Sequence, residues 1–214
     1  MKIVYWGDSI TNAGKNLKGG STASLGQGYV FLTAARLSTQ RPGSYTFLNR
    51  GMPGNRIVDL YARIKSDVWN QEPELLSILV GFNDAWFELI GQPTGVETGR
   101  FAEIYRTLLS ETRERLPETQ LLLMEPFTLC GPATEPYWER LNREVRQRAE
   151  IVRSLAMEFR AGFVELQNQF DDACRQMPVT YWLADGVHPT PAGHQLIAEA
   201  WMRVFETEQK EHVR

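Results

Sequence analysis

The chain has 214 residues, 43% of them hydrophobic and 23% charged, and a formal net charge of -3 at pH 7. This length and composition are typical of a globular protein, so we expect a single domain over residues 1–214 with a core of ordinary size. Acidic and basic residues are interspersed and the apolar runs are short, which argues against nucleic-acid binding and against membrane association.

Short apolar runs alternate with longer amphipathic ones along the whole chain. Runs rich in Val, Ile and Leu with little alternation predict strands that are buried on both faces of a parallel sheet. The regular exchange of strands and helices predicts an α/β fold, a three-layer α/β/α sandwich with a five-stranded parallel sheet. In chain order the predicted strands are Lys2–Tyr5, Tyr45–Asn49, Leu75–Val80, Gln120–Met124 and Gly162–Glu165. The predicted helices are Gly28–Thr39, Ile57–Asn70, Arg100–Arg115, Tyr137–Phe159, Gln167–Arg175 and Pro191–Thr207.

The remaining segments are predicted to be loops. The Gly- and Ser-rich stretch Asn12–Gln27 and the segment Gly91–Gly99 are interpreted as active-site loops rather than as domain boundaries. The polar tail Glu206–Arg214 is expected to fray. Since the chain passes from its first residues directly into a strand, we expect no signal peptide and a cytoplasmic location.

Polar and glycine-containing segments follow three of the predicted strands, and a fourth such segment precedes the last helix. Because ligands of an open parallel sheet bind beyond the carboxyl ends of its strands, we expect these segments to meet at one edge. The segments are Gly7-Asp8-Ser9, Asn49-Arg50-Gly51-Met52-Pro53-Gly54-Asn55, Gly81-Phe82-Asn83-Asp84 and Asp185-Gly186-Val187-His188.

These segments supply the groups that acyl transfer requires. Ser9 is predicted to attack a carbonyl carbon, and His188 to accept the serine proton and return it to the leaving alcohol. Asp185, three residues before His188, is predicted to accept the other imidazole N–H. The backbone N–H groups of Ser9 and Gly51 and the side-chain amide of Asn83 are predicted to form the oxyanion hole. The sequence therefore predicts a serine esterase.

No metal site is expected. Cys130 and Cys174 lack the spacing of metal ligands and are expected to be reduced thiols. Asp185, His188 and His194 could form a carboxylate–histidine–histidine set, but His194 falls inside the last predicted helix and no fourth ligand is evident.

The four segments resemble the motifs of the SGNH (GDSL-type) hydrolase superfamily, whose name lists a catalytic serine, glycine, asparagine and histidine. The first motif ends in Ile10 where leucine is usual, and the last continues into Pro189. The resemblance runs along the whole chain and implies a flavodoxin-like sheet and metal-independent ester hydrolysis without a cofactor.

Within this superfamily the chain looks most like bacterial intracellular acetylxylan and carbohydrate acetylesterases. This resemblance implies a small-molecule or oligosaccharide ester substrate, such as an acetylated xylo-oligosaccharide, and a homo-oligomer. Asp8, which is also expected to hydrogen-bond the nucleophile turn, Asp84, Trp86 and Ala184 are interpreted as shaping the substrate pocket. That branch often has tryptophan where this chain has Ala184, with Trp182 two positions earlier. The segments that carry the resemblance are Gly28-Tyr29-Val30, Gly51 to Leu60, Asn83-Asp84-Ala85-Trp86, Glu125-Pro126-Phe127 and Leu183-Ala184-Asp185.

Other functions remain open at this point. A lysophospholipase, a thioesterase or a broad arylesterase would use the same triad, although the lack of a long apolar lid segment favours a short acyl group. A catalytically silent module that binds acetylated glycans would need no nucleophile–base pair, so the complete set of residues argues against it. His194 and the tryptophans have no assigned role.

Overall fold

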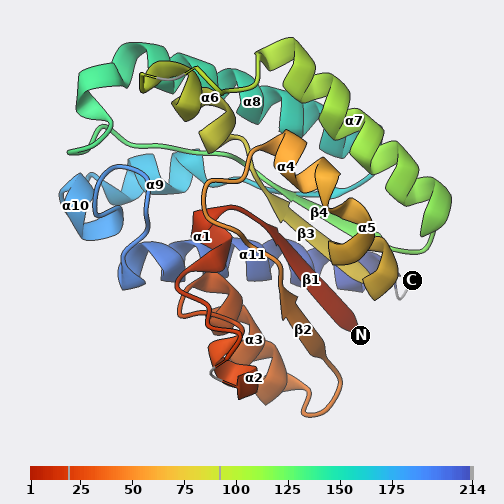
Figure 1. The fold of residues 1–214 in the computed structure, drawn as a ribbon. Coiled ribbons are helices and arrows are strands. Elements are labelled where there is room, and N and C mark those ends of the chain that lie inside the picture. The colour runs from red at the N-terminus through yellow and green to blue at the C-terminus, as the bar shows by residue number, and fades with distance from the viewer. Residues whose placement is uncertain (19, 92, 213–214) are drawn as a thin grey trace.

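The structure, a computed structural model, describes residues 1–18, 20–91 and 93–212 (Figure 1). Its centre is a five-stranded sheet in the order β2-β1-β3-β4-β5, and every pair of neighbours is parallel. This order is that of flavodoxin-like folds. The predicted three-layer α/β fold is therefore confirmed. The strands are β1 (Lys2–Gly7), β2 (Thr46–Asn49), β3 (Leu75–Leu79), β4 (Gln120–Met124) and β5 (Gly162–Val164).

Helices cover both faces of the sheet (Figure 1). The α-helices are α1 (Ser9–Asn12), α2 (Gly20–Ala23), α3 (Tyr29–Gln40), α4 (Ile57–Ala62), α5 (Ile64–Asp67), α6 (Phe82–Leu89), α7 (Thr98–Arg115), α8 (Trp138–Glu158), α9 (Gln167–Ala173), α10 (Val179–Trp182) and α11 (Pro191–His212). Two short 3₁₀ turns, η1 (Trp69–Gln71) and η2 (Glu135–Tyr137), complete the described elements.

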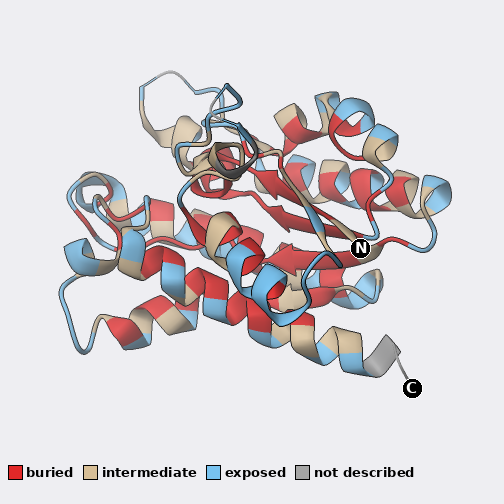
Figure 2. Ribbon diagram, turned by 90° about the horizontal axis from the view of Figure 1, so that it is seen from below, coloured by how far each residue is buried: buried red, intermediate tan, exposed pale blue. Residues whose placement is uncertain are grey.

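The core has two halves because successive side chains of a strand point to opposite faces of the sheet. Ile3 and Tyr5 of β1 pack against α3, α9 and α11, whereas Val4 and Trp6 pack against α4, α7 and α8. Figure 2 shows the central strands buried and the helices that cover the sheet exposed on their outer side, while the edge strand β2 is only partly buried. Each fully buried aliphatic or aromatic side chain of this kind contributes about 1.5–3 kcal/mol to stability.

One buried tryptophan fixes α11 to the sheet. Trp201 is fully buried, and its indole N–H donates to the hydroxyl of Ser77 on β3 at 2.9 Å. Its ring stacks on Phe205 with centroids 5.0 Å apart and lies 5.3 Å from the ring of Tyr5. Because a buried indole N–H without a partner is costly, this bond specifies where α11 docks.

The helix predicted at Ile57–Asn70 is broken in the structure. It divides at Arg63, whose backbone dihedrals of -112° and 8° are not helical, and the chain continues as α5 and η1. The Arg63 guanidinium is bound by Asp67, by the Asn55 side chain and by the Arg50 carbonyl. The amphipathic pattern of this segment predicted its buried face correctly but contained no signal for the break in the helix.

Several shorter elements were not predicted. α1, α2, α6 and α10 lie in segments that were interpreted as turns or loops, and α2 falls within the predicted loop Asn12–Gln27. The tail was expected to fray from Glu206, but α11 continues to His212. Glu206 pairs with Arg36 of α3 at 3.0 Å, and Gln209 donates to Gln120 of β4 at 2.7 Å. These contacts hold the end of the helix, while residues 213–214 lie outside the described part of the chain.

Two further observations bear on the expectations from sequence. Within the described ranges no helix is both long and apolar enough to span a bilayer. Cys130 and Cys174 are both free thiols, as expected.

Candidate active site

Ser9 lies at the turn between β1 and α1, at the carboxyl end of the sheet (Figure 1). The turn is tight because a Cβ on Gly7 would lie only 2.2 Å from the Leu79 carbonyl oxygen of β3. Asp8 caps α1, and its carboxylate accepts the Ile10 N–H at 2.9 Å. Ser9 is thus the first residue of a capped helix, where backbone N–H groups have no partner within the helix.

Asp8 is a supporting residue of this turn and is not among the residues that line the cleft beside Ser9. Its side chain is only 2% exposed, and burial raises its pKa to about 6 despite the bond from Ile10 and the nearby His188 ring. The expectation that Asp8 hydrogen-bonds the turn is confirmed, and its assignment to the substrate pocket stays a prediction.

The loop before α11 holds Asp185 and His188 in a fixed arrangement. The Asp185 carboxylate accepts the backbone N–H groups of Val187 at 2.9 Å and of His188 at 2.8 Å. The Ala184 N–H donates to the His188 carbonyl at 2.9 Å, and Leu183 forms an antiparallel bridge with Pro189. Ala184 therefore contributes its backbone to the loop, and its side chain is not among those that line the cleft beside Ser9.

Ser9, His188 and Asp185 form a continuous chain of side-chain hydrogen bonds. The Ser9 hydroxyl lies 3.1 Å from His188 Nε2, and His188 Nδ1 lies 2.7 Å from Asp185 Oδ2. Partial burial disfavours the Asp185 carboxylate, but the bonds from His188 and Val187 outweigh it and hold the Asp185 pKa below its usual value. An ionised carboxylate fixes the imidazole with its proton on Nδ1 and leaves Nε2 free to accept the serine proton.

The loop after β2 places Gly51 against the backbone of α1. The Gly51 N–H donates to Asn49 Oδ1 at 2.9 Å, and its carbonyl accepts from Asn12 Nδ2 at 3.2 Å. A Cβ on Gly51 would lie 2.4 Å from the Asn12 amide nitrogen, so only glycine fits. Its N–H is therefore already engaged within its own turn, and the oxyanion role of Gly51 stays a prediction.

Lys15 ties the same loop to the segment after α1. Its ammonium group donates to the Gly51 carbonyl at 2.5 Å and to the Asn49 carbonyl at 3.1 Å. Partial burial, followed by the nearby Arg63 and Arg50, lowers the pKa of Lys15 to about 8. This contact was not foreseen, because a lone lysine in a Gly- and Ser-rich stretch carries no sequence signal for it.

Gly54 was also missed at the sequence level. Met52 to Asn55 form a turn closed by the Asn55 N–H donating to the Met52 carbonyl at 3.2 Å, with Gly54 at a φ of 79°. Proline followed by glycine is the usual signature of such a turn. Pro53 lines the cleft beside Ser9, and the Gly54 N–H makes no hydrogen bond in the described part of the chain.

Asn83 and Asp84 lie in the first turn of α6 and both reach the loop after β2. Asn83 Nδ2 donates to the Asn55 carbonyl at 3.1 Å. Asp84 Oδ1 accepts the N–H of Ile57, the first residue of α4, at 2.9 Å. The prediction that these segments meet at the carboxyl edge of the sheet is therefore correct for Asn83, which α6 positions beside the turn that contains Gly54.

Asp84 is fully buried and is not among the residues that line the cleft beside Ser9, and its assignment to the substrate pocket stays a prediction. Burial raises its pKa to about 7, although the Ile57 N–H and the charge of Arg148 act in the opposite direction. Its second oxygen, Oδ2, has no hydrogen-bond partner. Asp84 is thus a structural cap whose ionisation costs free energy.

Trp86 also lies away from the cleft beside Ser9. Its ring stacks on Phe82 at 5.7 Å and meets Tyr137 edge-on at 5.5 Å. The two neighbours connect α6 to η2, so Trp86 packs between these elements, and its role in shaping the substrate pocket stays a prediction.

The cleft beside Ser9 has a volume of ≈ 470 Å³ and is lined by both polar and apolar side chains. It is bounded by the nucleophile turn, by the segment before α3 and by the start of α11. Its lining residues are Ser9, Ile10, Asn12, Ala13, Gly14, Gln27, Pro53, His188, Pro189, Pro191 and His194.

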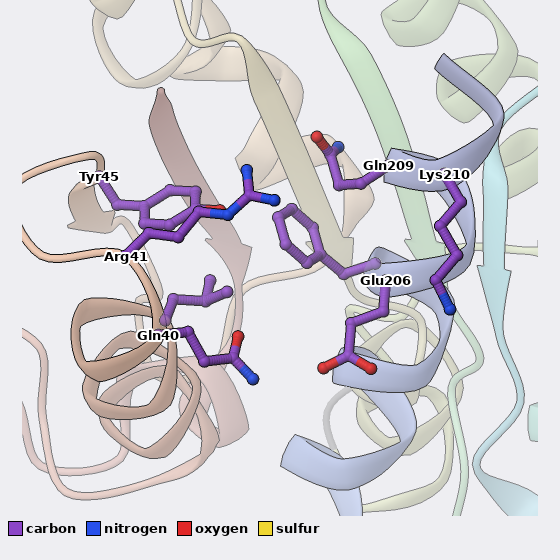
Figure 3. Close-up of a pocket in the computed structure, with 8 residues that line it drawn as sticks. Gln40, Arg41, Tyr45, Glu206, Gln209 and Lys210 are labelled. Carbon is purple, nitrogen blue, oxygen red and sulfur yellow. The ribbon is translucent and has the colours of Figure 1, made fainter. Parts of the chain in front are cut away.

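Figure 3 shows a larger hollow, of ≈ 750 Å³, between the ends of α3 and α11. Tyr45 on its wall directly precedes β2, which places the hollow at the amino end of the sheet, opposite Ser9. Its lining residues include no serine, cysteine or histidine, so this hollow offers no nucleophile–base pair. The smaller cleft, which contains Ser9 and His188, is therefore the candidate active site. Among the described residues there is also no cluster of three or more metal-ligating side chains.

Comparison with known proteins agrees with this geometry. The GDSL-like lipase/acylhydrolase family model matches residues 5–196. An acetylxylan esterase of Geobacillus stearothermophilus is 31% identical over 208 residues, covering 94% of this chain and 92% of that relative. The crystal structure of this esterase, Axe2, superposes with a TM-score of 0.84 at 29% identity, covering 94% and 92% of the two chains.

A second solved structure is that of a protein designated a GDSL-like lipase from Parabacteroides merdae. It superposes with a TM-score of 0.87 at 35% identity, covering 95% of this chain and 94% of that one. Together with the serine–histidine–aspartate arrangement, these relationships show that the chain is a carboxylic ester hydrolase of the SGNH type and belongs to the GDSL-like lipase/acylhydrolase family.

Proposed function

We propose that the protein is a serine esterase that removes short acyl groups, above all acetyl groups, from carbohydrate esters such as acetylated xylo-oligosaccharides. The observation that carries the proposal is the hydrogen-bonded chain from the Ser9 hydroxyl through His188 to Asp185. A serine becomes an effective nucleophile when a neighbouring base takes its proton and a third group orients that base.

The reaction proceeds in two halves. Ser9 Oγ attacks the ester carbonyl carbon while its proton passes to His188 Nε2, and Asp185 stabilises the resulting imidazolium. The bond to the alcohol oxygen then breaks, and this oxygen takes the proton from His188, leaving an acyl-enzyme on Ser9. In the second half a water molecule gives its proton to His188 and attacks the acyl carbon, and Ser9 recovers its proton as the acid leaves.

Mutants of the Geobacillus relative support the same roles. Solved structures of Axe2 described as catalytic mutants replace one serine, one aspartate and one histidine. Those three residues have the same separations along their chain as Ser9, Asp185 and His188 have here. The proposed assignment of nucleophile, orienting carboxylate and base therefore agrees with the relative's pattern.

Three donors are proposed for the oxyanion: the Ser9 N–H, the Asn83 side-chain amide and the Gly54 N–H. Ser9 begins α1 and has no acceptor within that helix for its N–H. Asn83 bonds the carbonyl of Asn55 and so lies beside the Gly54 turn. Gly54 replaces Gly51, whose N–H is taken by Asn49. Each donor of this kind typically contributes about 2.7–4 kcal/mol to transition-state stabilisation.

A polar substrate fits the cleft better than a lipid does. Asn12, Gln27 and His194 line the space next to Ser9, together with prolines and only one long aliphatic side chain, Ile10. A long acyl chain would leave these polar groups without partners, which is costly in a desolvated site. These three polar side chains can form hydrogen bonds with the hydroxyl groups of a sugar.

The deciding experiment compares initial rates for wild type and Ser9→Ala on acetylated xylo-oligosaccharide, p-nitrophenyl acetate and p-nitrophenyl octanoate. We expect serine-dependent release of acetate from the sugar and slow turnover of the octanoate. Faster turnover of the octanoate, with the sugar untouched, would keep the triad but make the enzyme a lysophospholipase, a thioesterase or a broad arylesterase.

A further inference from the structure

His194 is a buried histidine that lines the cleft beside Ser9 and has no part in the proton transfers described above. It lies in the first turn of α11, six residues after His188. Buried polar side chains usually have a hydrogen-bond partner, and one of the two ring nitrogens of His194 has such a partner. The other nitrogen has none among the residues that the structure describes.

The ring of His194 is held rigidly. Its Nδ1 accepts the backbone N–H of Tyr29, the first residue of α3, at 3.2 Å. It lies parallel to the Tyr29 ring, with centroids 6.5 Å apart. The absence of a side chain at Gly28 makes space for the His194 ring, because a Cβ on Gly28 would lie 2.6 Å from His194 Cε1. The imidazole therefore has one orientation.

These contacts determine the protonation state of the ring. Burial, followed by the charge of nearby His188, lowers the pKa of His194 to about 4, so the ring is neutral at neutral pH. Because Nδ1 accepts a hydrogen bond, the single ring proton is on Nε2. This Nε2 has no partner in the described ranges, nor is it one of the fully enclosed polar atoms of the interior. It is a donor that reaches the cleft.

The position of the cleft indicates which half of an ester it receives. His188 must return its proton to the alcohol oxygen, so the alcohol leaves on the His188 side of Ser9. His188, Pro191 and His194 all line the cleft, from the start of α11 and the loop before it. Gln27 also lines this cleft, and its exposed side chain offers both a hydrogen-bond donor and an acceptor.

We propose that His194 is a substrate-binding residue that donates its Nε2 hydrogen to a hydroxyl group of the leaving alcohol, and that it thereby selects polyhydroxylated alcohols. Gln27 is the second hydrogen-bonding side chain of this subsite. The inference rests on the proposed serine esterase mechanism, since it assigns the alcohol half of the substrate to the cleft beside Ser9. It involves hydrogen bonds only and adds no chemical step.

Two variants separate this role from the bond to Tyr29. His194→Asn keeps an acceptor near the position of Nδ1 but has no donor near Nε2, whereas His194→Gln keeps a donor near Nε2. Gln195→Ala is the matched control, because Gln195 is exposed on α11 outside the cleft. For each protein we would measure kcat/KM on acetylated xylo-oligosaccharide and on p-nitrophenyl acetate, whose alcohol has no further hydroxyl group.

The expected result is that His194→Asn lowers the ratio of the two kcat/KM values about 3- to 10-fold, mainly through KM for the sugar, as the loss of one neutral hydrogen bond implies. His194→Gln should recover part of this ratio, and Gln195→Ala should leave it unchanged. An equal loss on both substrates, or no loss on either, would overturn the proposal and leave His194 as a cap of α3.

A second readout keeps this test independent of the natural substrate. The acetyl-enzyme formed from p-nitrophenyl acetate can be captured by added xylose or by 1-propanol, and the ratio of the two products reports recognition of the alcohol. If wild type does not deacetylate sugars, the proposed sugar substrate fails, but preferential capture by xylose that falls 3- to 10-fold in His194→Asn would still support the subsite. Capture without preference in wild type, or a ratio that His194→Asn does not change, contradicts it.

Discussion

The side-chain amide of Asn83 donates to the backbone carbonyl of Asn55 at 3.1 Å, which joins the start of α6 to the loop that follows β2. The next residue, Asp84, bonds the Ile57 N–H two residues beyond that carbonyl. Asn83 and Asp84, consecutive residues of α6, thus each form a hydrogen bond with the end of the loop that follows β2, one before and one after Arg56. This arrangement places the Asn83 amide beside the turn that contains Gly54, the two groups proposed above, with the Ser9 N–H, as oxyanion donors.

Asn83→Ala is expected to lower kcat about 10²–10³-fold with a small change in KM. The lost amide acts on the charge that develops in the transition state, so the effect belongs to kcat. Steady-state kinetics on p-nitrophenyl acetate measures it. Asn168→Ala, an exposed position on α9, is the control and should retain the wild-type rate. An unchanged rate for Asn83→Ala would remove Asn83 from the oxyanion hole.

Ser9→Ala is expected to lower ester turnover at least about 10³-fold, because no other nucleophile in the cleft lies next to His188. The thermal unfolding midpoint should change little, since the Ser9 hydroxyl bonds only the exposed His188 ring. Rates and melting curves of Ser9→Ala, with the exposed Ser38→Ala as the control, test both parts. Retained activity in Ser9→Ala would exclude an acyl-enzyme on this residue.

Asp185→Asn is expected to lower kcat about 10²–10⁴-fold. The amide nitrogen that replaces Oδ2 cannot accept the His188 Nδ1 hydrogen, so the imidazole loses the tautomer that serves as a base. The oxygen that bonds the Val187 and His188 N–H groups can be kept by the asparagine, which preserves the loop. Asp172→Asn on the surface of α9 is the matched control. Comparable rates in the two variants would contradict the orienting role of Asp185.

Much of the fold could be predicted from the sequence because its strands carry strong local signals. The run Leu121–Met124 is apolar and bounded by Gln120 and Glu125, and the structure has β4 over the predicted residues Gln120–Met124. The contact between Ser9 and His188 could be predicted for a similar reason, since each belongs to a distinct local pattern and the parallel sheet brings strand ends to one edge.

The oxyanion loop could not be assigned in the same way. Gly51 and Gly54 both look suitable in sequence, and only the hydrogen bond from the Gly51 N–H to Asn49 distinguishes them. The role of His194 was equally inaccessible, because its bond to the Tyr29 N–H joins residues that are far apart in the chain. Contacts of this kind depend on how α3 and α11 dock, which a local pattern does not contain.

Asp84→Asn is expected to make the free energy of unfolding less sensitive to rising pH. Burial raises the pKa of Asp84 from 3.8 to about 7, so between these values the folded state holds a proton that the unfolded state has lost. Stability therefore falls as pH rises from about 4 to about 7, by up to roughly 4 kcal/mol for a shift of this size. Asparagine does not titrate, and its side-chain oxygen can still accept the Ile57 N–H.

Denaturant unfolding of wild type and Asp84→Asn at pH 4.5 and pH 8 measures the effect. The contribution of Asp8 to the pH dependence cancels in this comparison, because Asp8 titrates in both proteins. The free energy of unfolding of Asp84→Asn, relative to wild type, should be higher at pH 8 than at pH 4.5, whereas Asp172→Asn should show no such change. A relative stability of Asp84→Asn that stays constant with pH would show that Asp84 ionises in the folded protein as readily as in water.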